Sequence, residues 1–417
     1  MNLRKLFFTV LAAGLVWSGA SYAATSWLVS SSPTGLVYGT YANQNQSSAV
    51  NKIPDFSKAG YQGGGVTIPF VPAAVTVSPS GGDDTAAIQN AINTVSAMPV
   101  GADGFRGAVV LEAGDYTVSS SLSISTSGVV LRGAGSQESG GTKITYTAKT
   151  SSNVINISGG SGPSEIGGTR VDIADSFVPV GAKSFTVSDA SGFSPGDQIM
   201  VQNMVNDQWI TDLSDMSQWG WSASGYQIGY RYVVTAVNGN TITIDAPIVQ
   251  TIEDQYGGGD VYRYSDNLLE NIGVEAIRFV STYEHIIDED HGVRAVRIDK
   301  LQNGWVRQIT ARHFVQGAVS IDSNSQFITV EDCAALDHIS LISGGRRYSF
   351  SIDDSQYLLI QRCLTRDGRH DYVSGSRTPG PNAFVDCRAD EPNSDTGPHH
   401  RYATGQIYDN IMGGAIN

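Results

Sequence analysis

The chain has 417 residues, of which 41% are hydrophobic, and its 40 Asp and Glu residues outnumber its 26 Lys and Arg residues to give a net charge of −14. This acidic balance argues against nucleic acid and anionic membranes as partners. A chain of this length can bury a large core, either as one elongated domain or as two, and we expect a monomer.

The first 23 residues have the form of an export signal. A positive start at Arg4 and Lys5 precedes an apolar run over residues 6–16, which is too short to cross a membrane, and small residues before position 24 suit cleavage after Ala23. Residues 1–23 are therefore predicted to be a signal peptide, and the protein to be secreted or periplasmic. No later run is long or apolar enough for a membrane helix.

An extended arm and a capping helix are expected next. Residues 24–75 are rich in Ser, Gly, Asn and Pro with little periodicity, which predicts an arm lying over the main body. Beyond them Ile88, Ile92 and Val95 recur on one helical face, and such a helix can cover the open end of a solenoid. Short β-branched runs separated by glycine follow, so residues 76–170 are assigned to the capping helix and the first coils.

Three motifs of this segment resemble a known superfamily. They are Asp-Asp-Thr-x-Ala-Ile-Gln-x-Ala-Ile from residue 83, Val-Val-Leu-x-x-Gly-x-Tyr from residue 109 and Val-Val-Leu-Arg-Gly-Ala-Gly from residue 129. In this order they look like the N-terminal entry of the pectate-lyase-like right-handed β-helix superfamily. The resemblance implies an all-β chain wound as a right-handed parallel β-helix. Lyases, hydrolases, epimerases and phage tailspikes share that fold, so it leaves the substrate open.

Residues 171–262 are predicted to be a small antiparallel β-rich subdomain inserted between coils. The pair Asn238-Gly239 between two alternating runs is a strong hairpin signal. The segment is also rich in aromatic residues, about half of which we expect to form its own core, while the others, Trp221 among them, could make a sugar-stacking wall. Its large rings are Trp209, Trp219, Trp221, Tyr226, Tyr230 and Tyr232.

Coils resume over residues 263–417, where a short apolar motif repeats at steps of 32, 24, 30, 24 and 23 residues. The motifs begin at Val274, Val306, Val330, Ile360, Phe384 and Ile407. Cys333, Cys363 and Cys387 share the fourth slot of this motif. We therefore expect a stack of free, buried thiols rather than disulfides or a metal site.

A histidine follows each of four of these strands. His313, His338, His370 and His400 each precede a small or polar residue and a glycine. If each repeat is one coil, these side chains should stack at intervals of about 4.8 Å on one face. His313 has apolar neighbours and is more readily explained by packing, whereas the run His399-His400-Arg401 favours function.

All ten basic residues after Lys300 are arginines, whose planar fork suits carboxylates and sulfates. An anionic polysaccharide is therefore the expected partner, although several arginines could instead pair with local aspartates. Together with the histidines and tyrosines near them, these arginines provide the groups that β-elimination on a uronate needs. These groups are a cation at the carboxylate, a base and an acid. Arg369 and Arg401 are predicted to clamp the carboxylate, with His400 or His370 as the base and Tyr372 or Tyr402 as the acid. The predicted substrate-binding residues are His338, Arg346, Arg347, Arg377, His399 and Trp221.

The sequence also allows other functions. A glycoside hydrolase would use paired carboxylates. The stretch Asp395-Thr-Gly-Pro-His399-His400 is similar in part to the Asp-Pro-His-Asp/Glu signature of alginate C5-epimerases, which implies proton abstraction without cleavage. No cofactor is firmly predicted, but Ca²⁺ on the carboxylates or zinc on the histidines is conceivable. A carbohydrate-binding, tailspike-like protein is the non-enzymatic alternative. The carboxylates that could serve a hydrolase or bind Ca²⁺ are Asp353, Asp354, Asp367, Asp371, Glu391 and Asp395.

Overall fold

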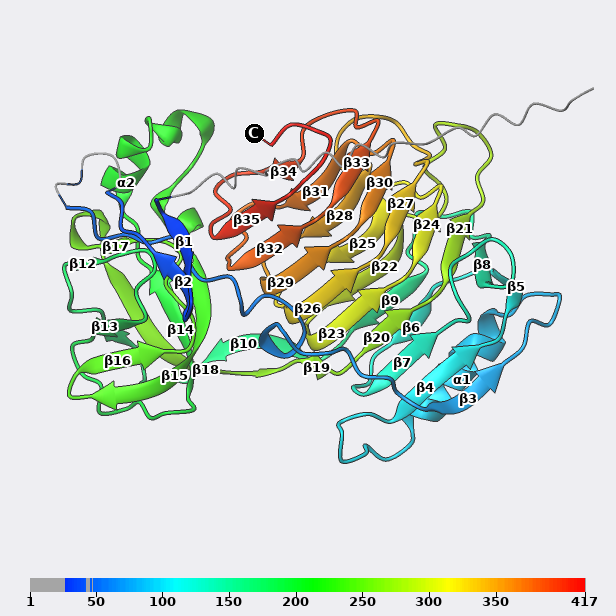
Figure 1. Cartoon of the computed structure of the whole chain (residues 1–417), viewed down its shortest axis with the longest axis horizontal. Coiled ribbons are helices and arrows are strands. Elements are labelled where there is room, and N and C mark those ends of the chain that lie inside the picture. Colours follow the sequence, from blue (N-terminus) through cyan, green and yellow to red (C-terminus); the bar gives the residue numbers. More distant parts are fainter. Residues whose placement is uncertain (1–26, 43–45, 47, 417) are drawn as a thin grey trace, which may run out of the picture.

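A computed structural model describes residues 27–42, 46 and 48–416, so the predicted signal peptide lies outside the described residues. Three long parallel sheets run side by side through most of the chain (Figure 1). Each coil contributes one strand to each sheet in turn, and we call these the first, second and third sheets. Winding one chain through three parallel sheets makes a parallel β-helix, as the sequence motifs predicted.

The first sheet contains the repeat that was recognised in the sequence. Its strands are β3 (Ala73–Val77), β4 (Gly107–Leu111), β7 (Val129–Arg132), β19 (Leu269–Glu270), β20 (Gly273–Glu275), β23 (Leu301–Arg307), β26 (Gln326–Glu331), β29 (Gln356–Gln361), β32 (Asn382–Val385) and β35 (Gln406–Asp409).

The second and third sheets follow in every coil. The second consists of β5 (Gly114–Val118), β8 (Thr142–Tyr146), β21 (Arg278–Ser281), β24 (Thr310–Arg312), β27 (Ala334–Leu336), β30 (Leu364–Arg366) and β33 (Arg388–Asp390). The third consists of β6 (Leu122–Ile124), β9 (Ile155–Ser158), β22 (Arg294–Asp299), β25 (Gly317–Ile321), β28 (Tyr348–Ile352), β31 (His370–Ser374) and β34 (Gly397–Pro398).

A single left-handed residue makes the bend between the first and second sheets in each later coil. The bend residues have φ between 50° and 59°, and they are Ala276, Gln308, Asp332, Arg362, Asp386 and Asn410. Such a bend reverses the in–out alternation of side chains within one residue. The next residue therefore points into the core.

The three cysteines occupy that inward position. Cys333, Cys363 and Cys387 are free, buried and part of one hydrophobic cluster, which confirms the predicted thiol stack. The successive pairing of Val306 with Val330, of Val330 with Ile360 and of Ile360 with Phe384 also confirms the proposed repeat. In the last coil Phe384 pairs with Tyr408, not Ile407, so that alignment was off by one residue.

The N-terminal part covers the coils. Helix α1 (Thr85–Ser96) buries Ile88, Ile92 and Val95 against the first coils, as predicted. Before it, the chain lies over the first sheet, where the Tyr61 amide donates to Thr329 Oγ1 at 2.9 Å. Strands β1 (Val29–Ser32) and β2 (Gly35–Tyr38) form a separate hairpin.

An antiparallel subdomain interrupts the coils between β9 and β19, confirming an inserted β unit (Figure 1). Asn238 ends one strand of its predicted hairpin and Thr241 begins the next. Its strands are β10 (Ser161–Glu165), β11 (Val171–Asp172), β12 (Phe177–Val178), β13 (Ser184–Thr186), β14 (Gln198–Asn203), β15 (Gly229–Asn238), β16 (Thr241–Ile244), β17 (Ile252–Glu253) and β18 (Gly259–Asn267), with one α-helix, α2 (Asp207–Asp212). No helix among the described residues is long and apolar enough to span a membrane.

Candidate active site beside the third sheet

The predicted ladder of four histidines does not form. His313 occupies a left-handed turn position with φ of 67°, which Asp337 and Asp367 occupy in the following coils. His338 comes one residue after that position, His370 begins β31, and His400 follows β34. The loops between the strands differ in length, so a similar order of motifs in the sequence did not mean an equal position in the coil.

The turns that follow the third sheet carry the charged groups instead. Ile298, Ile321 and Ile352 pair in register, so Asp299, Asp322 and Asp353 follow them as a stack. In the next two coils the same place is taken by Gly375 and then His399. We call this stretch of each coil the third-sheet turn. It brings three carboxylates into line with the predicted His399-His400-Arg401 run.

Gly375 makes room for the carboxylate of Asp353. A Cβ atom at Gly375 would lie 1.6 Å from Oδ1 of Asp353, so no other residue fits there without displacing that carboxylate. Asp353 is open to solvent, yet protein surrounds it on most sides, as in a recess. This burial, helped by the charge of Asp322, raises its pKa, while His400 acts in the opposite direction.

Three imidazoles and one carboxylate meet next to this recess. The rings of His370 and His399 lie 3.7 Å apart between centroids, and those of His399 and His400 lie 4.3 Å apart. Nδ1 of His370 donates to the Asp395 carbonyl oxygen at 2.9 Å and lies 3.2 Å from Oδ1 of the same residue. His370 is buried, whereas His400 is exposed, so only His400 of the two predicted bases can meet a polymer.

Burial sets the protonation of the central imidazole. It lowers the pKa of His399 to about 4, and the neighbouring His370 and His400 add to this effect. Burial also lowers the pKa of His370. His399 is therefore neutral at neutral pH.

A tyrosine that did not enter the predicted set completes the cluster. Tyr348 begins β28, and its ring meets His370 and His399 edge-on at 5.3 and 5.4 Å. Burial raises its pKa, which the guanidinium of Arg369 partly opposes. The sequence shows its place directly after Arg346-Arg347, whereas its pairing with His370 appears only in the structure.

A metal ion fits this cluster poorly. His370, Asp395 and His399 each offer a ligand atom within 4.8 Å of the others. However, the His370 nitrogen that faces Asp395 donates its proton to that residue, and the other nitrogen, Nε2, lies on the opposite side of the ring. Ca²⁺ takes roughly six to eight oxygen ligands, which two imidazoles and one carboxylate do not supply. The geometry is that of a hydrogen-bonded His–Asp pair.

The predicted arginines divide into two groups. Arg346 forms a two-pronged ion pair with Glu289, and the buried Arg347 pairs with Asp367 at 2.9 Å. Both therefore hold loops together and are not placed as subsite contacts. Arg369, Arg377 and Arg401 have no ion pair within the described part of the chain.

The inserted subdomain contributes an aromatic wall on the Arg401 side. Trp221 stacks on Tyr226 at 4.1 Å, and Arg377 Nη1 donates to the Gly225 carbonyl at 2.8 Å. Tyr402 packs edge-on against Trp209 at 4.8 Å, and burial raises its pKa to about 12. Tyr402 is thus part of this aromatic cluster and is not placed as an acid.

Two further predicted residues lie in the interior. The Tyr372 ring is fully buried and its hydroxyl donates to the Cys363 and Arg388 carbonyls, so it cannot reach a polymer. His338 is also buried, with Nε2 3.0 Å from Ser349 Oγ, which in turn lies 2.5 Å from Asp371 Oδ1. Burial lowers the pKa of His338 to about 4 and raises that of Asp371 to about 6.

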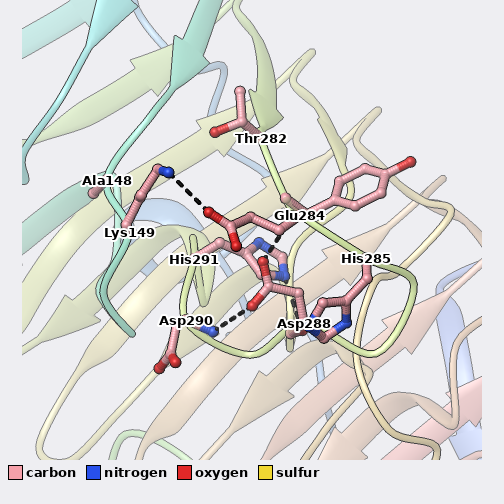
Figure 2. Close-up of a pocket in the computed structure, with 9 residues that line it drawn as sticks. Ala148, Lys149, Thr282, Glu284, His285, Asp288, Asp290 and His291 are labelled. Carbon is pink, nitrogen blue, oxygen red and sulfur yellow. Dashed lines mark hydrogen bonds and ion pairs between the residues drawn. The ribbon is translucent and has the colours of Figure 1, made fainter.

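A separate cavity lies at the loop between β21 and β22. It measures about 410 Å³ and is lined by polar groups that mostly satisfy one another (Figure 2). Asp288 accepts from the Glu284 and Asp290 amides, and Glu284 pairs with Lys149 at 2.8 Å. No arginine lines it. The third-sheet turn offers the richer chemistry.

Comparisons with known proteins supply no function for this chain. No family model and no curated protein matches the sequence. The fold, read from its own parallel sheets and the right-handed sense of parallel crossovers, is a right-handed parallel β-helix. Similar solved structures include the tailspike protein gp49 from Pseudomonas phage LKA1, at 15% identity over 79% of this chain and 52% of that one with a TM-score of 0.46. Geobacillus virus E2 ORF18 matches at 15% identity over 81% and 47%, with a TM-score of 0.42. This chain spans about half the length of each.

Proposed function

We propose that the protein acts on an anionic polysaccharide and cleaves it by β-elimination at a uronate. The observation that carries this proposal is the set of arginines without carboxylate partners, Arg369, Arg377 and Arg401, around an exposed histidine and a protonated tyrosine. Arg369 is half-buried and Arg377 and Arg401 are exposed, so all three guanidiniums are free to meet an anionic ligand.

The reaction assigns one role to each group. Arg369 and Arg401 neutralise the uronate carboxylate, which acidifies the adjacent C5 proton and stabilises the enolate-like intermediate. His400 removes that proton, with Asp353 next to it to stabilise the imidazolium that forms. The electron pair forms the C4=C5 double bond, the C4–O bond breaks, and the leaving oxygen takes the proton of Tyr348.

The neutral His399 separates the two proton-transfer groups. Its ring lies between His370 and His400 and meets Tyr348 edge-on. Because its pKa is about 4, it adds no positive charge at neutral pH that would compete with the arginines or repel an imidazolium at His400. We assign it to positioning and substrate contact.

Hydrolysis is the second candidate, because the third-sheet turn stacks Asp322 next to Asp353. Their unequal environments raise the pKa of Asp353, as a general acid requires, and leave Asp322 in an ion pair with Arg297 at 2.6 Å. In that reaction Asp353 would protonate the glycosidic oxygen. The arginines would then serve only binding.

A screen against alginate, pectate, glucuronan, ulvan and glycosaminoglycans separates these outcomes. β-Elimination produces an unsaturated uronate with strong ultraviolet absorbance, hydrolysis produces reducing ends without it, and an epimerase changes the uronate NMR spectrum without shortening chains. We expect unsaturated product, and we expect His400→Ala to abolish it with little loss of thermal stability. Reducing ends without absorbance, or full activity of His400→Ala, would refute the elimination mechanism.

A further inference from the structure

Arg231 is a buried arginine with spare hydrogen-bonding capacity. It lies on β15 in the inserted subdomain and is 7% exposed. Its guanidinium donates to the Asn324 carbonyl at 3.1 Å and to Asn324 Oδ1 at 2.7 Å. Arginine has five N–H donors, so these two bonds leave three without a partner, and no carboxylate of the described chain pairs with it.

This guanidinium lines a cavity between the subdomain and the coils. The cavity measures about 190 Å³, and we call it the Arg231 pocket. Its walls are partly polar and partly apolar, and its chief lining residues are Met200, Gln202, Arg231, Tyr262, Asn324 and Asp354. Gly229 leaves room for the Met200 side chain at the wall, since a Cβ there would lie 2.7 Å from the sulfur.

The pocket adjoins the candidate active site. Asp353 and Asp354 are consecutive residues of one third-sheet turn, and Asp353 lies within reach of the charge of His400. Asp354 lines the pocket and lies within reach of the charges of Arg231 and Arg377. The Arg377 amide in turn donates to the Arg401 carbonyl at 2.8 Å. A bound chain that passes the active site can therefore place a neighbouring sugar over the pocket.

We propose that the Arg231 pocket is a second anion subsite, which binds a carboxylate or sulfate ester on the sugar next to the one that reacts. A buried guanidinium without a carboxylate partner costs free energy that a bound anion offsets, and the fork of Arg231 can meet two oxygens of either group. Asp354 can accept hydrogen bonds from the hydroxyls of the same sugar. The proposal rests on the proposed function only for the identity of the reacting sugar.

The subsite restricts the substrate class. It favours polymers with an anionic group on consecutive residues over polymers in which isolated uronates alternate with neutral sugars. It also places part of the specificity in the inserted subdomain, because Arg231 belongs to that subdomain, whereas Asn324 and Asp354 belong to the coils.

Binding without turnover tests the subsite. The Tyr348→Phe protein is titrated calorimetrically with oligogalacturonate, with a sulfated carrageenan oligosaccharide and with neutral cellohexaose. Adding Arg231→Gln should weaken whichever anionic ligand binds by about tenfold to a hundredfold, without changing the response to cellohexaose. Preference for oligogalacturonate identifies a carboxylate as the occupant, and preference for the carrageenan oligosaccharide identifies a sulfate ester.

A matched control separates charge from folding. Arg263→Gln removes another arginine of the same subdomain, which pairs with Asp197 outside the pocket, and should leave binding unchanged. Arg231→Lys keeps the charge but loses the fork and should give an intermediate affinity. Unchanged affinity of folded Arg231→Gln, or no binding of either anionic oligosaccharide, would overturn the subsite. Absence of unsaturated product from the wild-type protein would instead overturn the elimination mechanism alone.

Discussion

The second sheet and the third-sheet turn both carry arginines and aspartates, but they use them differently. On the second sheet Arg312 and Arg366 both donate to Asp337, at 2.5 and 2.9 Å, and the pKa of Asp337 is lowered to about 2, chiefly by its hydrogen bond with Arg366. Beside the third sheet, Arg369, Arg377 and Arg401 have no such partner in the part of the chain that the structure describes. Paired charges stabilise a surface, whereas a group of unpaired charges of one sign is available to bind a ligand of opposite charge.

The largest expected effect comes from removing the proposed acid. Tyr348→Phe keeps the ring contacts with His370 and His399 but removes the proton, so kcat should fall by about a thousandfold. Initial rates from ultraviolet absorbance measure this, and circular dichroism should show an unchanged melting temperature. Tyr283→Phe, at the separate large cavity, is the matched control. Equal activity of the two variants would exclude Tyr348 as the acid.

Replacing an unpaired arginine should reduce kcat/KM, whereas replacing an arginine that is held in an ion pair should not. Arg401→Gln should reduce kcat/KM by about a hundredfold, since a charge-assisted contact to the carboxylate is lost. Arg366→Gln on the second sheet should leave kcat/KM within about twofold and cost about 1 kcal/mol or less of stability, because its ion pair is partly exposed. Steady-state kinetics on both variants decide this, and equal losses would contradict the division.

The buried His338–Ser349–Asp371 chain should show opposing pH effects. His338 has a folded pKa of about 4, below its ordinary value near 6.5, so its contribution to stability falls as pH drops between those values. Asp371 has a folded pKa of about 6, above its ordinary value, so its contribution falls as pH rises from about 4 to 6. The two effects largely cancel in the wild type.

Asp371→Asn removes the effect of Asp371 on the pH dependence of stability, so the effect of His338 is no longer offset. Its unfolding free energy should fall by about 3 kcal/mol more than that of the wild type as pH drops from about 6.5 to 4. Urea unfolding at a series of pH values measures the difference. Parallel curves for the two proteins would show that the two groups do not oppose each other.

Arg347 provides a smaller effect on stability alone. Arg347→Met removes hydrogen bonds to the Ser340 carbonyl and to Asp367, which should cost about 2 kcal/mol. Activity per folded molecule should not change, because the side chain is buried. A loss of kcat without loss of stability would return Arg347 to the substrate-binding set.

The sequence was sufficient for the architecture because the first-sheet repeat has nearly constant composition. Apolar residues at Val306, Val330 and Ile360, with a thiol or isoleucine three positions later, predicted both the coil and its interior. The site was predicted only in part. His400, Arg369 and Arg401 lie beside it, but loops of unequal length moved His313 and His338 to other positions in the coil.

Short motifs also could not distinguish inward from outward side chains. Tyr372 follows His370 by two residues, yet its ring lies in the core, where Phe350 stacks on it at 5.7 Å. Tyr348 lies in the preceding coil and has no motif of its own. Its role depends on the register between β28 and β31, which only the assembled coils define.

The antiparallel unit departs from the coils and returns to them at one place, because Ser161 pairs directly with Asn267 across its two ends. Its length is therefore uncoupled from the pitch of the solenoid. Such a unit behaves as a cassette: another one could be grafted at the same junction, and polymer preference could diversify while the rungs beneath stayed the same.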